Sequence, residues 1–92
     1  GLVAELDRGT WTPAPVFGMI AQRGRIERAE MEKTFNMGVG MVAVVAHEDT
    51  DRALAILTAR HLDCWVLGTV AKGSTRSKDA PRATLVGQHP RF

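Results

Sequence analysis

The 92-residue sequence contains one cysteine, no tyrosine and no long apolar run. Cys64 has no second cysteine with which to form an internal disulfide, and this favours a reducing compartment such as the cytoplasm. No stretch approaches the roughly 20 apolar residues that span a bilayer. Residues 1–11 lack the basic and apolar regions of a signal peptide. We therefore expect a cytoplasmic protein without a membrane partner.

An excess of charge is also nearly absent, because the formal net charge is only +2. Most of the excess lies in residues 72–82, "KGSTRSKDAPR", where the basic residues outnumber a single acid. Such a stretch is typical of a solvated loop, although it could also hold phosphate. Nucleic-acid binding usually requires aromatic residues beside the charge, and none lies between Trp65 and Phe92. We expect no nucleic-acid partner.

The residues after the first tryptophan carry the signals of a helix start. The pattern predicts a helix over residues 13–23, with Thr12 as the cap, Pro13 in the first helical position and Gly24 as the stop. Its apolar face would consist of Val16, Phe17 and Ile20.

Two further stretches have helical spacing. Residues 25–35 predict a second, shorter helix with its charged residues mostly outward. Residues 47–61 predict a third helix, capped by Asp49 or Thr50. Its apolar stripe would consist of Ala53, Ile56 and Leu57.

Four stretches have the composition of β-strands. Residues 2–6 alternate like a half-buried strand, whereas residues 41–46 are apolar on both faces, like a strand covered by helices on each side. Residues 64–70 and 83–87 predict two more strands, joined by the basic loop as a long hairpin. The order of elements predicts one α/β domain, a mixed β-sheet covered by helices with residues 41–46 as its central strand.

The chain offers little catalytic chemistry. His47, His61 and His89 lack the spacing of a metal site, and Cys64 has the setting of a small buried hydrophobic residue. We therefore expect no metal ligand and no catalytic residue in this chain. Trp11 and Trp65 are either packing anchors or stacking surfaces for a ring.

The most distinctive segment is "TFNMGVG", residues 34–40. Its two glycines do not form a dinucleotide-binding fingerprint, because that motif follows a strand and opens a helix with a third glycine. Two interpretations remain open on local pattern. Glycine here permits either a turn whose amides hold an anion, or a helix-stop turn that leads into the sheet.

Larger blocks of the sequence resemble a known family. "WTPAPVF" (11–17), "EMEKTFNMGVGMVAVV" (30–45) and "WVLGTV" (65–70) together resemble the C-terminal domain of aminoimidazole ribonucleotide synthetases, or phosphoribosylformylglycinamidine cyclo-ligases. The resemblance covers nearly the whole chain. It implies an enzyme of de novo purine biosynthesis that converts formylglycinamidine ribonucleotide to aminoimidazole ribonucleotide, with ATP and magnesium activating the formyl oxygen.

The same resemblance implies that residues 1–92 are part of a C-terminal domain whose N-terminal ATP-binding domain is absent. ATP and magnesium would bind mainly to that domain, which would also form most of a homodimer, and the fragment alone would be inactive. The surface facing the absent domain would bind the substrate through Asn36, Gly38, Gly40 and, as a weaker candidate, Thr34.

Other functions stay open at this point. The chain could be a non-catalytic α/β binding or regulatory module, or belong to a related ATP-using enzyme such as selenophosphate synthetase. A reading frame that continues upstream into a nucleotide-binding domain would favour the enzyme over the module.

Overall fold

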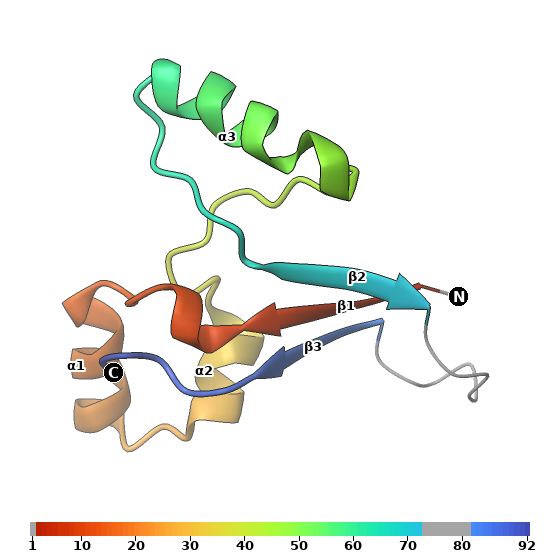
Figure 1. Cartoon of the computed structure of the whole chain (residues 1–92). Helices are drawn as coiled ribbons and strands as arrows, with labels where there is room; N and C mark the ends of the chain where they lie inside the picture. Colours follow the sequence, from red (N-terminus) through yellow and green to blue (C-terminus); the bar gives the residue numbers. More distant parts are fainter. Residues whose placement is uncertain (1, 73–81) are drawn as a thin grey trace.

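The computed structural model describes residues 2–72 and 82–92, and it has an α/β fold with a mixed sheet, as predicted. Figure 1 shows three neighbouring strands with two helices at one end of the sheet and a third helix set apart. The elements are β1 (Leu2–Asp7), η1 (Arg8–Thr10), α1 (Pro15–Gly24), α2 (Arg28–Thr34), η2 (His47–Asp49), α3 (Thr50–Ala59), β2 (Gly68–Lys72) and β3 (Ala83–Val86).

Strand β1 forms the centre of the sheet, in the order β2-β1-β3. It pairs antiparallel with β2, where Leu6 lies opposite Gly68, and parallel with β3, where Leu6 lies opposite Leu85. The hairpin predicted between the two later strands is therefore wrong, because each pairs with β1 instead. Residues 73–81, most of the basic loop, lie outside the described residues.

Close backbone approach explains one glycine in the sheet. A Cβ atom at Gly68 would overlap the carbonyl oxygen of Glu5 in β1. Only a residue without a side chain lets β2 begin its pairing here.

Residues 41–46, predicted as the central buried strand, form no strand and are exposed. Met41 is 90% exposed and Val44 is 75% exposed. Apolar composition favours a strand only where a neighbouring strand binds its amides and helices cover its faces. Within residues 2–72 and 82–92, no strand pairs with this segment. The predicted central strand is therefore wrong, because no neighbouring strand binds its backbone amides.

Helix α1 begins at Pro15 rather than Pro13. Ala14 is the N-cap and makes no side-chain capping bond, so the predicted role of Thr12 is also wrong. The cause is local, because a residue before proline is disfavoured in helical conformation, and both Thr12 and Ala14 precede one. The helix ends at Gly24, and Arg25 takes the left-handed conformation that follows it.

Helices α2 and α3 lie where predicted but are shorter. Asp49 is the N-cap of α3, although its side chain makes no capping bond and instead pairs with Arg52 at 3.0 Å. Residues 64–67 precede β2, and of these Leu67 accepts a hydrogen bond from the N–H of Asp7 at 2.9 Å; the strand itself is shorter than predicted. Among the described helices, none has both the length and the apolar character needed to cross a bilayer.

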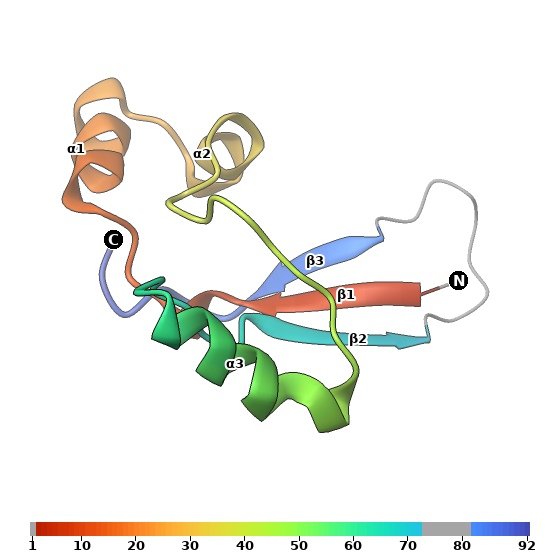
Figure 2. The ribbon, with the colours of Figure 1, turned by 90° about the horizontal axis from the view of Figure 1, so that it is seen from above.

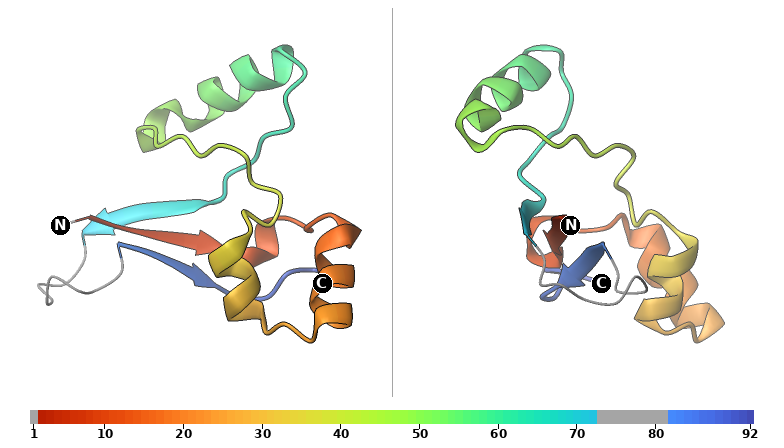
Figure 3. Two further views of the ribbon diagram at one scale, coloured as in Figure 1. Left: turned by 180° about the vertical axis from the view of Figure 1, so that it is seen from behind. Right: turned by 90° about the vertical axis from the view of Figure 1, so that its right-hand side faces the viewer.

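The arrangement leaves little interior. Figures 2 and 3 show α1 and α2 beside each other at one end of the sheet, whereas α3 stands away from the strands and packs mainly against η2. The chain has a Cα radius of gyration of 15.1 Å, whereas a compact chain of this length has one of about 12 Å. The buried hydrophobic side chains of the described residues are Met31 and Met37.

Candidate functional site

The predicted site forms a tight turn after α2. The backbone N–H of Val39 donates to the carbonyl oxygen of Asn36 at 3.1 Å, and the N–H of Gly38 donates to Oδ1 of Asn36 at 2.8 Å. Met37 and Gly38, the central residues, have φ values of 56° and 99°. Positive φ at both central positions is characteristic of a type I′ turn, and the asparagine side chain stabilises the turn from within.

The two glycines of this segment differ in what the structure requires of them. The φ of 99° at Gly38 is a conformation that other residues adopt only with strain. Gly40 has no positive φ, and a Cβ atom there would meet no atom within 4 Å. The turn thus explains Gly38 but gives no local reason for glycine at position 40.

Aromatic side chains hold the turn in place. Trp11 Nε1 donates to the carbonyl oxygen of Met37 at 3.1 Å, and the Met37 side chain is buried. Phe17 of α1 packs edge-on against Phe35 with ring centroids 5.9 Å apart. The turn is therefore tied to α1 and to the segment before it, which positions its exposed side.

The four predicted substrate-binding residues lie together on this segment. Asn36, Gly38 and Gly40 are exposed, and Met37 between them is buried. Thr34 is the exposed last residue of α2. Gly38 adopts the positive φ that the turn requires, whereas a Cβ atom at Gly40 would meet open space, and neither position decides between the two earlier interpretations.

An ion pair beside the turn was not predicted from the sequence. Arg8 in η1 binds Glu32 of α2 through Nε to Oε2 at 2.7 Å and Nη2 to Oε1 at 2.9 Å. Its Nη1 also donates to the carbonyl oxygen of Gly87 at 3.1 Å. Glu32, expected to point outward, thus links α2 to the ends of β1 and β3.

This pairing changes the ionisation of both groups. The hydrogen bond from Arg8 lowers the pKa of Glu32 below its usual value, although partial burial opposes the effect. The same bond raises the pKa of Arg8. Both side chains therefore remain charged at neutral pH, and no local sequence pattern could have revealed a pair 24 residues apart.

Trp11 is also the centre of an aromatic group. Its ring lies edge-on to His89, with centroids 4.7 Å apart, and 6.3 Å from Trp65. His89 Nδ1 donates to the carbonyl oxygen of Arg8 at 3.0 Å, and Trp65 Nε1 donates to Thr10 Oγ1 at 3.1 Å. These contacts favour packing over ligand stacking for both tryptophans.

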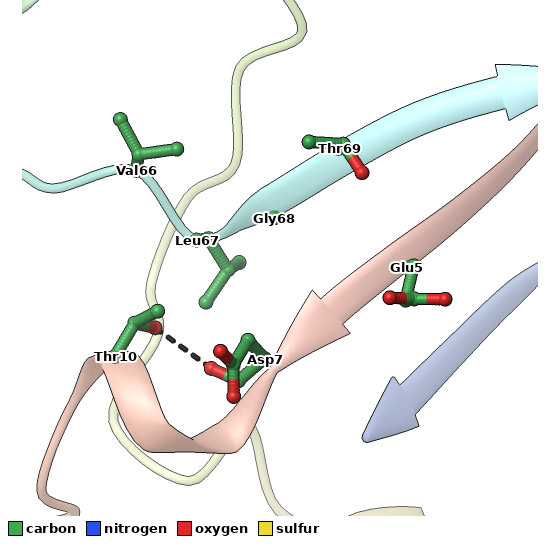
Figure 4. Close-up of a pocket in the computed structure, with 7 residues that line it drawn as sticks. All are labelled: Glu5, Asp7, Thr10, Val66, Leu67, Gly68 and Thr69. Atoms are coloured by element: carbon green, nitrogen blue, oxygen red, sulfur yellow. Dashed lines mark hydrogen bonds between the residues drawn. The ribbon is translucent and has the colours of Figure 1, made fainter. Parts of the chain in front are cut away.

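A pocket of about 260 Å³ lies elsewhere, where β1 ends and β2 begins (Figure 4). Thr10 Oγ1 donates to the Asp7 carbonyl oxygen at 2.8 Å, and Asp7 Oδ1 accepts from the N–H of Gly9 at 2.8 Å. This pocket is smaller than most ligand pockets, which measure about 300–1,000 Å³. None of the predicted site residues is among those that line it: Glu5, Asp7, Thr10, Val66, Leu67, Gly68 and Thr69.

Metal-binding groups are not gathered in the described structure. Within residues 2–72 and 82–92, no cluster of three His, Cys, Asp or Glu side chains could hold an ion. Cys64 is a half-buried free thiol, with Sγ 3.5 Å from Thr58 Oγ1. The residues described here therefore do not form a magnesium site, and we assign no step through magnesium to them.

Comparison with known families gives a match over residues 1–79 to the family "AIR synthase related protein, C-terminal domain". The chain belongs to this family. The AIR synthase-related chain is also 49% identical over 89 residues to a Streptomyces fradiae protein named "Putative phosphoribosylformylglycinamidine cyclo-ligase". It is 41% identical over 73 residues to the phosphoribosylformylglycinamidine cyclo-ligase of Caldicellulosiruptor bescii, and 44% identical over 70 residues to that of Burkholderia vietnamiensis.

The AIR synthase-related chain is shorter than these relatives. The first match covers 97% of this chain and 49% of the Streptomyces protein. The other two cover 79% and 76% of this chain but only 21% and 20% of the relatives. The chain thus spans about half of one relative and about a fifth of the others.

Proposed function

We propose that these residues form part of the C-terminal domain of an ATP-dependent phosphoribosylformylglycinamidine cyclo-ligase. The observation that carries the proposal is the 49% identity to the Streptomyces protein across 97% of this chain. In the complete enzyme, phosphorylation would turn the formyl oxygen of formylglycinamidine ribonucleotide into a leaving group. Ring closure by the amidine nitrogen would then give aminoimidazole ribonucleotide.

In this proposal, the present chain supplies a substrate-facing surface and not the phosphoryl-transfer site. An N-terminal domain would bind ATP and magnesium and would form most of a cytoplasmic homodimer. The exposed backbone at Asn36, Gly38 and Gly40, with Thr34 beside it, would face that domain and hold polar groups of the substrate. The fixed turn supports this role, because a backbone anchored by Trp11 presents the same groups each time the substrate binds.

A chimeric enzyme tests the proposal directly. The 73 residues of the Caldicellulosiruptor bescii enzyme that match this chain would be replaced by their counterparts here. We expect substrate-dependent ADP formation by the chimera and none by the isolated 92-residue chain. A chimera that folds and dimerises like the parent enzyme but shows no turnover would contradict the assignment, as would native-like turnover by the isolated chain.

A further inference from the structure

The last residues of the chain return to the helices that flank the turn. Figures 1 and 3 show residues 87–92 running from β3 to α1. Arg28 Nη1 of α2 donates to Oε1 of Gln88 at 2.8 Å. A Cβ atom at Gly18 of α1 would lie 3.6 Å from the carbonyl carbon of Phe92. The segment thus reaches both helices beside the candidate site.

His89 in this segment contacts the indole that supports the turn. Its ring lies edge-on to Trp11 with centroids 4.7 Å apart, and its centroid is 5.8 Å from that of Phe92. Because Nδ1 donates to the carbonyl oxygen of Arg8 at 3.0 Å, the imidazole keeps one orientation against the indole. Trp11 in turn donates to the carbonyl oxygen of Met37 at 3.1 Å. His89 is therefore connected to the turn through a single intermediate residue.

The second ring nitrogen of His89 separates this role from simple packing. Nε2 is hidden from solvent and has no hydrogen-bond partner within residues 2–72 and 82–92. A phenyl ring would fill the same space without a buried, unpaired nitrogen, which is unfavourable. Histidine supplies instead the bond from Nδ1, which sets the direction of the ring. The position therefore favours orientation of a neighbour over maximal stability.

We propose that His89 is a positioning residue: it fixes the Trp11 indole and, through the bond from Trp11 to Met37, the backbone of the turn at residues 36–39. The family match ends at residue 79, so this support comes from outside the matched part of the chain. That the turn holds substrate rests on the proposed function. The positioning itself does not, because it is a property of the 92-residue chain alone.

His89→Phe in the full 92-residue chain tests the positioning. The substitution keeps a ring beside Trp11 but removes both the Nδ1 bond and the unpaired Nε2, so the urea midpoint should change little. Solvent exchange of the Trp11 indole N–H, followed by NMR, should nevertheless become about fivefold faster, the effect of losing one ordinary hydrogen bond. The Trp65 indole N–H, which is bonded to Thr10, is the internal reference and should keep its exchange rate.

Gln88→Ala is the matched control. It removes the neighbouring bond to Arg28 and leaves the imidazole in place, so it should change the exchange of either indole by less than about twofold. The proposal is overturned if the Trp11 indole exchanges at the same rate in His89→Phe and wild type, or if Gln88→Ala accelerates it equally. A large fall in the urea midpoint of His89→Phe, with equal acceleration of both indoles, would also overturn it, because it would mark a packing residue.

A chimera that carries all 92 residues connects the positioning to catalysis. There, His89→Phe should raise KM for formylglycinamidine ribonucleotide about threefold or more with a smaller change in kcat, and Gln88→Ala should change KM by less than about twofold. An unchanged KM in His89→Phe would show that the turn meets no substrate. Absence of turnover by the unsubstituted chimera would contradict the proposed function, whereas the indole exchange rates would still decide the role of His89.

Discussion

The guanidinium of Arg8 and the carboxylate of Glu32 form two parallel hydrogen bonds that join η1 to α2. Each side chain is only 11% exposed. The other ion pair in the described residues, Arg52 with Asp49, has side chains 73% and 45% exposed. Geometry and burial therefore predict unequal contributions to stability from the two pairs.

Replacing Glu32 tests this contrast. Glu32→Gln leaves the Arg8 charge partly buried without its partner, and we expect the free energy of unfolding to fall by about 2 kcal/mol. The matched change Arg52→Gln breaks an exposed pair and should cost less than about 0.5 kcal/mol. Urea unfolding at one protein concentration measures both, and equal losses would show that burial of the Arg8 pair does not matter.

The same pair predicts a dependence of stability on pH. Since folding lowers the pKa of Glu32, its contribution is fully present above the unfolded pKa, about 4.3, and is lost as the pH falls through the lower folded value. Urea midpoints of the wild type and Glu32→Gln should therefore converge between about pH 5 and pH 3. A difference that stayed constant over this range would contradict the assigned cause.

The α/β class and most helices follow from the sequence because helix signals are local. The apolar spacing, Pro13 and Gly24 predicted a helix over residues 13–23, close to the observed Pro15–Gly24, although the helix begins at Pro15 and not at Pro13. Strand pairing depends on distant residues, and this is why the hairpin between β2 and β3 was predicted wrongly. The strand predicted at residues 41–46 is wrong for the same reason. Apolar composition indicates that a segment can be buried, but it does not show that another strand covers it.

The sequence predicted the segment that carries the candidate site, but not the tertiary contacts that hold this segment in place. Glycines at 38 and 40 indicated an unusual backbone, and the structure places Gly38 in the exposed turn and Gly40 just after it, without a positive φ. The bond from Trp11 to the carbonyl of Met37 joins residues 26 apart, and no periodicity marks it. Contacts of this kind come from tertiary packing, which a single sequence does not display.

Trp11→Phe tests whether the indole holds the turn. The substitution keeps an aromatic ring beside His89 but removes the Nε1 hydrogen bond to Met37. We expect a loss of about 1 kcal/mol in unfolding free energy and faster amide exchange at Met37 and Gly38. Trp65→Phe, which removes the bond to Thr10 instead, should leave exchange in the turn unchanged. Equal effects of Trp11→Phe and Trp65→Phe on amide exchange at Met37 and Gly38 would show that Trp11 has no specific role in holding the turn.

Substitutions at Gly38, in the turn, and at Gly40, just after it, distinguish a structural role from a role in substrate binding. Gly38→Ala must hold a side chain at a φ of 99°, so it should lower stability by about 1–2 kcal/mol whatever the function. Gly40→Ala adds a methyl group to open space in this chain and should change stability by less than about 0.5 kcal/mol. Thermal unfolding of the isolated chain at a fixed concentration measures both changes.

In the chimeric enzyme, Gly40 is therefore the informative position. If the backbone at Gly40 lies against substrate or the adjoining domain, Gly40→Val should lower kcat/KM by about tenfold or more while leaving the unfolding temperature nearly unchanged. Val16→Leu at an exposed position of α1 serves as the control for a small change in apolar volume. If Gly40→Val is as active as the parent chimera, Gly40 is not part of the site. If activity and unfolding temperature fall together, Gly40 has a packing role instead.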